Sequence, residues 1–212
     1  ALVVDARDGK VLGAASQLYD LIPNLPPGAK EQHPHTWRDA TAAAIRSALR
    51  QAKAVAAEVA AIGVSGQQHG FVPLDKSGEV IRPAKLWCDT STATECGQIM
   101  DAVGGAGACI AAAGNPILAG YTASKLPWTR KHRPEAYARL ASILLPHDYI
   151  NFVLTGRRFC EHGDASGTGW LDVRKREWSP ALLEATDARR DLGECLPTLV
   201  AADALFAIDP AE

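Results

Sequence analysis

Three consecutive polar side chains that could bind a ligand, Gln67, Gln68 and His69, stand between two glycines. They directly follow the apolar run 60–65, of which residues 60–64 predict a short buried strand. In open α/β sheets, ligands bind at the carboxyl ends of the strands, and two amides with an imidazole supply several hydrogen-bond donors and acceptors. The run therefore favours a site for a hydroxyl-rich ligand such as a sugar. A polar turn satisfied by backbone groups is the alternative.

A second strand end repeats this arrangement at Trp87, Cys88 and Asp89, after a predicted strand over 84–87. Beside a sugar, Trp87 would pack against C–H groups, and Asp89 would accept hydrogen bonds from hydroxyl groups. A core position is the alternative for Trp87, because tryptophan is highly buried on average. Nothing near Cys88 in the sequence predicts a lowered thiol pKa, so a packing role is expected for it.

Several common catalytic motifs are missing from the sequence. It has neither a phosphate-binding loop nor a dinucleotide fingerprint, and it has no His-Glu-x-x-His or Cys-x-x-Cys metal pattern. The run from Gly63 to Gln67 is similar to a serine-hydrolase nucleophile elbow, but Gln67 replaces the last glycine. That replacement argues against a serine hydrolase.

Two further polar groups have structural interpretations. Lys125 and its basic neighbours Arg130, Lys131 and Arg133 predict a solvated helix face. The segment 164–167 predicts a turn, a helix N-cap or a second ligand-facing loop.

The elements that position these residues are short strands followed by helices. Residues 2–4 and 11–15 predict a hairpin with Asp-Gly at its turn. Residues 21–35 predict a surface loop, and Thr36 with Asp39 predicts a capping box that opens a helix to about Val55. Further strands are expected at 71–74, 80–81, 84–87 and 170–173, and helices at 94–103, 106–113, 124–131, 134–141, 146–154 and 180–186. This order predicts an α/β sheet domain with a helical extension.

Composition excludes several classes of protein. With 212 residues, 47% hydrophobic residues and a net charge of -2, the chain can bury a core and is unsuited to bind nucleic acid. No apolar run reaches the roughly 18 residues of a membrane span. Five cysteines without paired short spacing predict reduced thiols and a cytoplasmic location. The sequence leaves a homodimer open.

Six ordered segments of the chain resemble the FGGY carbohydrate kinases and, within that family, its xylulokinase branch. They are 62–70 (IGVSGQQHG), 82–89 (RPAKLWCD), 114–126 (GNPILAGYTASKL), 144–149 (LLPHDY), 154–156 (LTG) and 164–173 (DASGTGWLDV). Several motifs in the expected order and spacing are far more specific than any one of them.

The resemblance implies that residues 1–212 form the first of two actin-like (ribonuclease H-like) domains, with a mixed sheet and a helical extension. It places the sugar-contacting pair of the family on Gln68 and His69, and a second pocket-lining segment on Trp87 and Asp89. It further implies transfer of the γ-phosphoryl group of ATP, with Mg²⁺, to D-xylulose or a similar ketose.

The resemblance also implies parts of the kinase outside this sequence. A first strand with an Asp-x-Gly-Thr hairpin is expected before Ala1, and a second domain with the general-base aspartate and the adenosine site after Glu212. No catalytic residue is therefore expected within 1–212, and this chain alone is predicted to be inactive. Departures from the family pattern at Gln68, Cys88 and Ser91 leave ribulose, a heptulose or glycerol open as substrates. A non-catalytic sugar-binding module also stays open.

Overall fold

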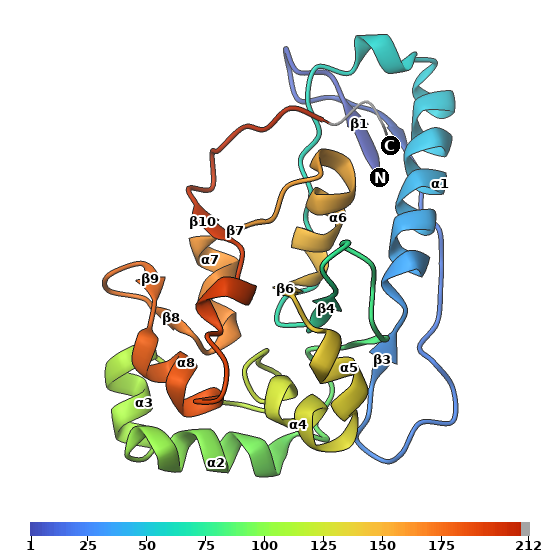
Figure 1. The fold of residues 1–212 in the computed structure, drawn as a ribbon. Coiled ribbons are helices and arrows are strands. Elements are labelled where there is room, and N and C mark those ends of the chain that lie inside the picture. Colours follow the sequence, from blue (N-terminus) through green and yellow to red (C-terminus); the bar gives the residue numbers. More distant parts are fainter. Residues whose placement is uncertain (209–212) are drawn as a thin grey trace.

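The computed structural model of the protein describes residues 1–208 (Figure 1). At the N-terminus, strands β1 (Leu2–Val4) and β2 (Val11–Ala14) form the predicted antiparallel hairpin. The hairpin packs on helix α1 (Pro34–Ala52). This packing is close, because a Cβ atom at Gly13 would lie 2.4 Å from the carbonyl oxygen of Ala48.

Helix α1 begins two residues before the predicted capping box. His33 is its extended N-cap, without a side-chain cap hydrogen bond, and Pro34 occupies the first turn. Proline is suited to that position because its φ angle is already helical and it has no N–H to satisfy. The capping box at Thr36 and Asp39 was therefore a wrong prediction. The helix ends at Ala52, where Lys53 adopts a left-handed conformation.

Four short strands form a small antiparallel arrangement at the centre. Strand β3 (Glu31–Gln32) pairs with β5 (Ala84–Lys85), and β4 (Val72–Leu74) pairs with β6 (Ser142–Leu144). A bridge between Phe71 and Lys85 joins the two pairs. Strand β3 was expected to be loop and β6 was missed, because strands of two or three residues carry no visible alternation.

The remaining elements are mostly helices (Figure 1), and all of these helices except α7, which was not predicted, lie close to their predicted positions. They are α2 (Ala93–Val103), α3 (Ala106–Ala113), α4 (Lys125–His132), α5 (Pro134–Arg139), α6 (Pro146–Thr155), α7 (His162–Ala165) and α8 (Pro180–Thr186). Between them, β7 (Phe159–Glu161) pairs in parallel with β10 (Thr198–Val200), and β8 (Leu171–Asp172) pairs with β9 (Glu177–Trp178). The described strands thus include parallel and antiparallel pairs, as expected for a mixed α/β domain.

Two main apolar clusters hold these elements together. One surrounds the fully buried Trp170 and joins helices α2, α3, α4 and α8. The other packs Trp37 of α1 and Tyr149 of α6 against the small central sheet. Within the described residues, no single helix is long and apolar enough to cross a membrane. Helices α2 and α3 pass such a test only as a pair, and they are bent by 81° at their junction.

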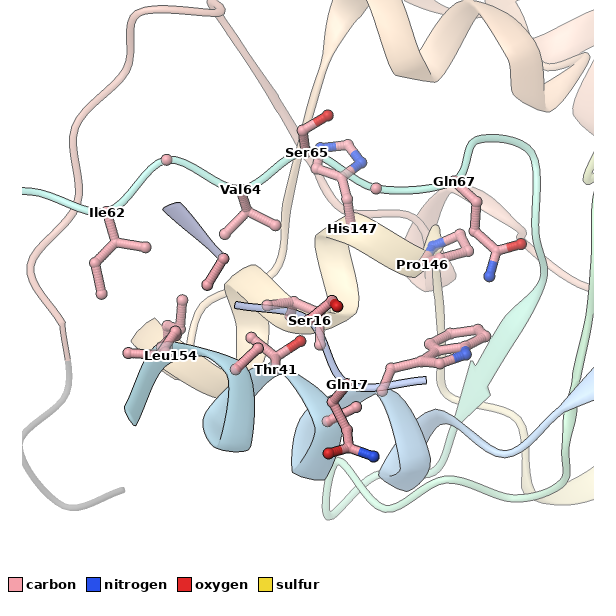
Figure 2. Close-up of a pocket in the computed structure, with 18 of the residues that line it drawn as sticks. Ser16, Gln17, Thr41, Ile62, Val64, Ser65, Gln67, Pro146, His147 and Leu154 are labelled. Atoms are coloured by element: carbon pink, nitrogen blue, oxygen red, sulfur yellow. The ribbon is translucent and has the colours of Figure 1, made fainter. Parts of the chain in front are cut away.

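The prediction of a buried strand at residues 60–64 was wrong. They run without regular secondary structure and are mostly exposed, and no backbone hydrogen bond to another described residue is formed along 60–66. Figure 2 shows Ile62 and Val64 of this segment along a groove of about 400 Å³, with Ser16, Gln17 and Thr41 on the other side. The segment is not a strand because no strand in the described part of the chain pairs with it.

Candidate functional site

The loop 66–70 rests on the beginning of α6. A Cβ atom at Gly70 would lie 2.5 Å from Cγ of Pro146, and one at Gly66 would lie 3.0 Å from Cβ of His147. Both glycines therefore allow the backbone to pass close over the helix. His69 has a φ of 62°, a left-handed conformation that is uncommon for residues other than glycine. Such strained backbone is often retained at ligand sites.

The imidazole of His69 is half-buried between two other parts of the chain. Its ring meets the ring of Tyr121 edge to face, with centroids 5.0 Å apart and planes at 86°. On another side it contacts the backbone of Gly167, where a Cβ atom would lie 2.1 Å from Nε2. Burial lowers the pKa of His69, Lys125 lowers it further, and Asp164 opposes the shift. A neutral imidazole at neutral pH can donate one hydrogen bond and accept another.

The two glutamines beside His69 differ in their surroundings. The amide of Gln67 donates to Oε1 of Gln32 over 3.2 Å, and the same oxygen accepts from the indole of Trp37 over 2.9 Å. These hydrogen bonds fix the Gln67 side chain at the N-terminal end of α1. The side chain of Gln68 is exposed. Gln68 and His69 are therefore the members of the run that remain open to a ligand, and their sugar contacts stay a prediction.

Trp87 is 57% exposed, which excludes the alternative of a core tryptophan. The loop 119–121 passes directly beside its backbone, because a Cβ atom at Gly120 would lie 2.7 Å from the Trp87 carbonyl oxygen. The next residue in that loop, Tyr121, contacts His69. One loop thus joins the two segments that the sequence singled out, at Trp87 and at His69.

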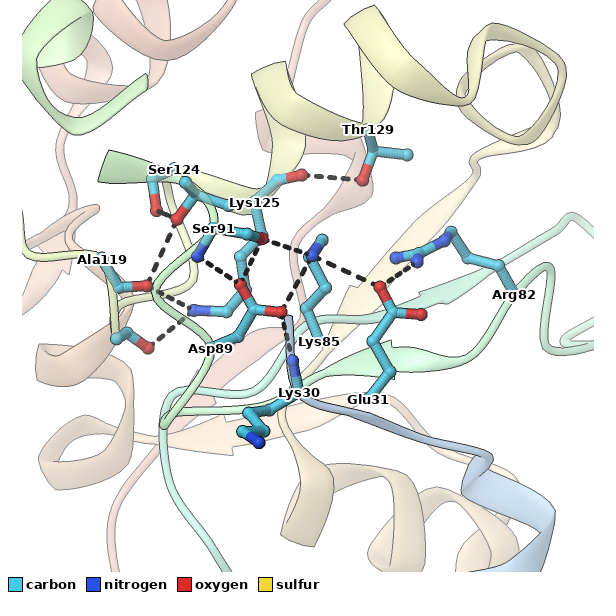
Figure 3. Close-up of polar contacts among 12 residues, drawn as sticks. Lys30, Glu31, Arg82, Lys85, Asp89, Ser91, Ala119, Ser124, Lys125 and Thr129 are labelled. Carbon is cyan, nitrogen blue, oxygen red and sulfur yellow. Dashed lines mark hydrogen bonds and ion pairs between the residues drawn. The ribbon is translucent and has the colours of Figure 1, made fainter. Parts of the chain in front are cut away.

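Asp89 is fully buried, and protein donors surround both of its carboxylate oxygens (Figure 3). Oδ1 accepts from the Ser91 backbone over 3.0 Å and from its hydroxyl over 2.6 Å. Oδ2 accepts from the Lys30 backbone over 2.8 Å and from Nζ of Lys85 over 2.9 Å. Burial by itself would raise the pKa of Asp89, but these hydrogen bonds together hold it below its ordinary value. In this structure Asp89 orients neighbouring side chains.

Lys85 connects Asp89 to a second buried ion pair. Its Nζ lies 3.3 Å from Oε1 of Glu31, which is itself 2.6 Å from the guanidinium of Arg82. The same ammonium lies 3.8 Å from the ring centroid of Trp128. The carboxylates of Glu31 and Asp89 thus alternate with the cations of Arg82 and Lys85, and the Trp128 ring lies against Lys85. Each of these buried charges has a partner of opposite charge. Sequence reasoning missed Glu31 and Lys85, because β3 and β5 meet only in the tertiary structure.

His147 lies between two buried carboxylates beside the loop 66–70. Its Nδ1 is 2.5 Å from Oδ2 of Asp164, and its Nε2 is 3.3 Å from Oδ1 of Asp148. Burial alone would lower the pKa of His147, but Asp164, Asp148 and Glu161 outweigh it and raise the pKa above its ordinary value. The imidazolium is therefore the counter-charge of Asp164, whereas burial raises the pKa of Asp148 to about 7.

The same cluster is poorly suited to bind Mg²⁺. Among residues 1–208, His147, Asp148 and Asp164 are the one group of histidine and acidic side chains close enough to share a metal ion. Mg²⁺ prefers six oxygen ligands in octahedral geometry, whereas both imidazole nitrogens here face the carboxylates. The cluster does not fit Mg²⁺.

Two other sequence interpretations change in the structure. Lys125 was expected on a solvated helix face, but its side chain is fully buried. The N-cap of α7 is Glu161, whose carboxylate accepts from the backbone of Gly163 over 2.7 Å and also from that of Asp164. Asp164 is therefore not a cap, and it faces His147 instead. A signal for Lys125 was present in the sequence, since apolar residues follow it within the run SKLPW.

Comparisons with known proteins give relatives of this chain. The profile of the "FGGY family of carbohydrate kinases, N-terminal domain" matches residues 1–208. The "Xylulose kinase" of Haemophilus influenzae is 42% identical over 207 residues, which are 96% of this chain and 42% of that protein. The "Xylulose kinase" of Escherichia coli is 39% identical over 178 residues, covering 84% of this chain and 36% of that protein. The chain thus spans less than half the length of these relatives.

Solved structures show the same fold. The crystal structure of "a xyloylose kinase" from Brucella ovis superposes with a TM-score of 0.87 at 32% identity, over 99% of this chain and 42% of that one. A "gluconate kinase" from Lactobacillus acidophilus superposes with a TM-score of 0.86 at 24% identity, over 99% of this chain and 41% of that one, which shows the fold alone. The expected actin-like α/β fold is confirmed. This chain belongs to the FGGY family of carbohydrate kinases, in the part that the family describes as its N-terminal domain.

Proposed function

We propose that the whole protein is a xylulokinase, which transfers the γ-phosphoryl group of ATP to D-xylulose and forms D-xylulose 5-phosphate. The chain described here supplies the wall that recognises the sugar. The observation that carries the proposal is the convergence of the loop 66–70 and the Trp87 segment on one loop, 119–121. The likeness to relatives named xylulose kinase supports the choice of sugar.

Each predicted residue has a role that its surroundings support. The neutral imidazole of His69 exchanges hydrogen bonds with a sugar hydroxyl, and the exposed amide of Gln68 binds a second one. The exposed ring of Trp87 packs against the C–H side of the sugar chain. Asp89 acts through Lys85 and Ser91, because its own oxygens are already bonded. None of the four is the general base, which we place outside residues 1–212. These residues bind and orient the hydroxyl that ATP phosphorylates.

A kinase for another sugar is the second candidate. The fold supports this reading, since a gluconate kinase superposes as well as xylulose kinases do. The departures at Gln68 and Ser91 lie in or beside the proposed wall, where they would alter contacts with sugar hydroxyl groups.

A substrate panel on the purified full-length protein tests the function. With ATP, we expect D-xylulose to show the highest kcat/KM among D-xylulose, L-ribulose, a heptulose, gluconate and glycerol. The 212-residue chain alone should phosphorylate none of them, because we place the base and the nucleotide site outside it. Turnover by the short chain, or a clear preference for another substrate, contradicts the proposal.

The domain organisation is part of the same proposal. We infer that residues preceding Ala1 in the longer protein contribute a strand that fills the groove of Figure 2. One wall of the groove includes Leu2 of β1, which pairs with β2 on one edge only among the described residues. The other wall is the unpaired segment 62–67. A strand edge and a neighbouring segment, both with free backbone groups, are a template for a strand between them.

Hydrogen exchange tests this strand. In the full-length protein, we expect the amides of Leu2 and Val64 to exchange roughly tenfold more slowly, or slower still, than in the 212-residue chain, because a paired backbone opens rarely. Leu2 is chosen because Ala1 and Ala15 form a hydrogen-bonded pair, which turns the amide of Leu2 away from β2. The amide of Ala48, inside α1, serves as the control and should differ little. Equal exchange of Leu2 and Val64 in both proteins contradicts the strand. We also place the protein in the cytoplasm, since its five cysteines are free thiols. Cofractionation with a secreted marker would contradict that location.

A further inference from the structure

Lys125 places a buried ammonium group beneath the loop that joins the two halves of the proposed sugar wall. Its side chain is fully buried at the start of α4. Nζ donates to three successive carbonyl oxygens, at 3.1 Å to Ala119, 2.7 Å to Gly120 and 2.7 Å to Tyr121. Figure 3 shows the ammonium directed at the Ala119 carbonyl. All three N–H groups of the ammonium are thereby used.

Apart from those to Lys125, the loop makes few hydrogen bonds. The backbone N–H of Tyr121 donates to the Leu118 carbonyl over 2.9 Å. The hydroxyls of Thr92 and Ser124 donate to the Ala119 and Tyr121 carbonyls, and both of these hydrogen bonds are long at 3.4 Å. Yet the loop contacts both parts of the wall, since the backbone of Gly120 lies against the Trp87 carbonyl and the ring of Tyr121 against His69. A change in the position of this loop would therefore move the surroundings of both predicted sugar contacts together.

We propose that Lys125 is a positioning residue for the sugar site, whose ammonium holds the loop 119–121 so that Tyr121 stays against His69 and Gly120 against Trp87. The part of this inference that concerns the sugar rests on the proposed function. Lys125 touches no reacting atom, and it acts only through the loop.

Lys125 must be charged to donate all three of these hydrogen bonds. A neutral amine has two N–H groups and a lone pair, so one of the three carbonyls would lose its donor and face the lone pair. Burial lowers the pKa of Lys125 to about 7, Asp89, Cys96 and Cys88 oppose that shift, and Lys85 adds to it. His69 also lies within electrostatic range. The three carbonyl acceptors favour the charged form, so we expect the ammonium to titrate at or above neutral pH.

As the pH rises, deprotonation of Lys125 weakens its contact with the loop 119–121 but increases the global stability of the protein. A lysine in the unfolded chain titrates near 10.5. Between the two pKa values the unfolded state binds more protons, so deprotonation of folded Lys125 makes the protein more stable as the pH rises. A weaker sugar affinity in that window is therefore not caused by unfolding through this group.

The first experiment needs no sugar. In the full-length protein, the ¹³Cε resonance of Lys125, assigned by its loss in Lys125→Met, should titrate with a pKa lowered by at least one unit. Hydrogen exchange of the amides of Tyr121 and Thr122 should accelerate over the same pH range, beyond the intrinsic rise with pH. Exchange with no step at the Lys125 pKa overturns the proposal.

The second experiment measures sugar use. Lys125→Met should raise KM for D-xylulose about tenfold or more, as expected for a lost charge-assisted contact, and leave KM for ATP unchanged. The matched control is Lys131→Met, because Lys131 lies on the same helix but is exposed. An unchanged sugar KM in a folded Lys125→Met protein overturns the proposal.

Two further outcomes remain decisive. If Lys125→Met does not fold, the wild-type profile carries the test: KM for the sugar should rise as the pH passes the Lys125 pKa, and a flat profile overturns the inference. If wild-type protein phosphorylates none of the tested sugars, the proposed function fails. The titration and exchange data then still decide whether Lys125 holds the loop.

Discussion

Replacing Gly167 with alanine should lower kcat/KM for the sugar by about 5- to 30-fold, as expected for losing about 1 to 2 kcal/mol of positioned hydrogen bonding. The added Cβ atom would lie 2.1 Å from Nε2 of His69, so the imidazole has to leave its place. KM for ATP should stay within about twofold of the wild-type value, because the nucleotide is bound elsewhere in the proposal. Steady-state kinetics of the full-length protein with D-xylulose and with ATP measure both effects.

A double-mutant cycle separates this effect from a general disturbance. His69→Asn is the suitable partner, because asparagine tolerates the left-handed backbone that His69 adopts. If Gly167→Ala acts by displacing the imidazole, it should cost little more once His69 is absent, so the two effects should not add. Additive losses would contradict this mechanism.

The control for an added methyl group is Gly97→Ala. Gly97 lies within α2, and a Cβ atom there would meet no other atom within 4 Å. We expect sugar kinetics like those of the wild type and a slight gain in helix stability. An unchanged sugar KM in both His69→Asn and Gly167→Ala would remove the basis for placing His69 in the sugar site.

Replacing Asp89 with asparagine should destabilise the protein by roughly 3 kcal/mol or more, the usual cost of breaking a buried ion pair. Both Asp89 and Lys85 have side chains with no exposed surface, and the substitution leaves the Lys85 charge with only the more distant Glu31 carboxylate. Urea denaturation followed by tryptophan fluorescence measures the free energy of unfolding. The exposed pair of Arg38 and Asp39 supplies the control, since Asp39→Asn should change little.

The charge left behind, and not the lost hydrogen bonds, is the expected cause of most of this cost. Combining Asp89→Asn with Lys85→Met should therefore recover part of the stability, because Glu31 keeps Arg82 as its partner. The pH dependence has a defined sign. The lowered pKa of Asp89 stabilises the fold above the unfolded value near 3.8, and this contribution is lost as the pH falls through the folded pKa. An Asp89→Asn variant as stable as the wild type would contradict the structural role of Asp89.

Local chemistry was enough to determine most helices and the family of this protein. Proline at the first turn marks the starts of α5, α6 and α8 within the sequence itself. The ordered motifs from residue 62 to residue 173 identify an FGGY kinase domain, because glycines, prolines and polar residues at fixed spacing are read directly along the chain. The residues chosen for the sugar wall came from the same motifs.

Tertiary structure decided what each of these residues does. Residues 60–64 have the composition of a buried strand, yet a strand needs a partner, and the described chain supplies none there. Lys125 has the composition of a solvated helix face, yet three carbonyls of a loop fold over it. Asp89 meets Lys30 only because β3 lies beside β5. Likewise His69 meets Gly167 across almost a hundred residues of sequence. Pairing, burial and close backbone contact depend on groups far apart in the chain, and no local pattern encodes them.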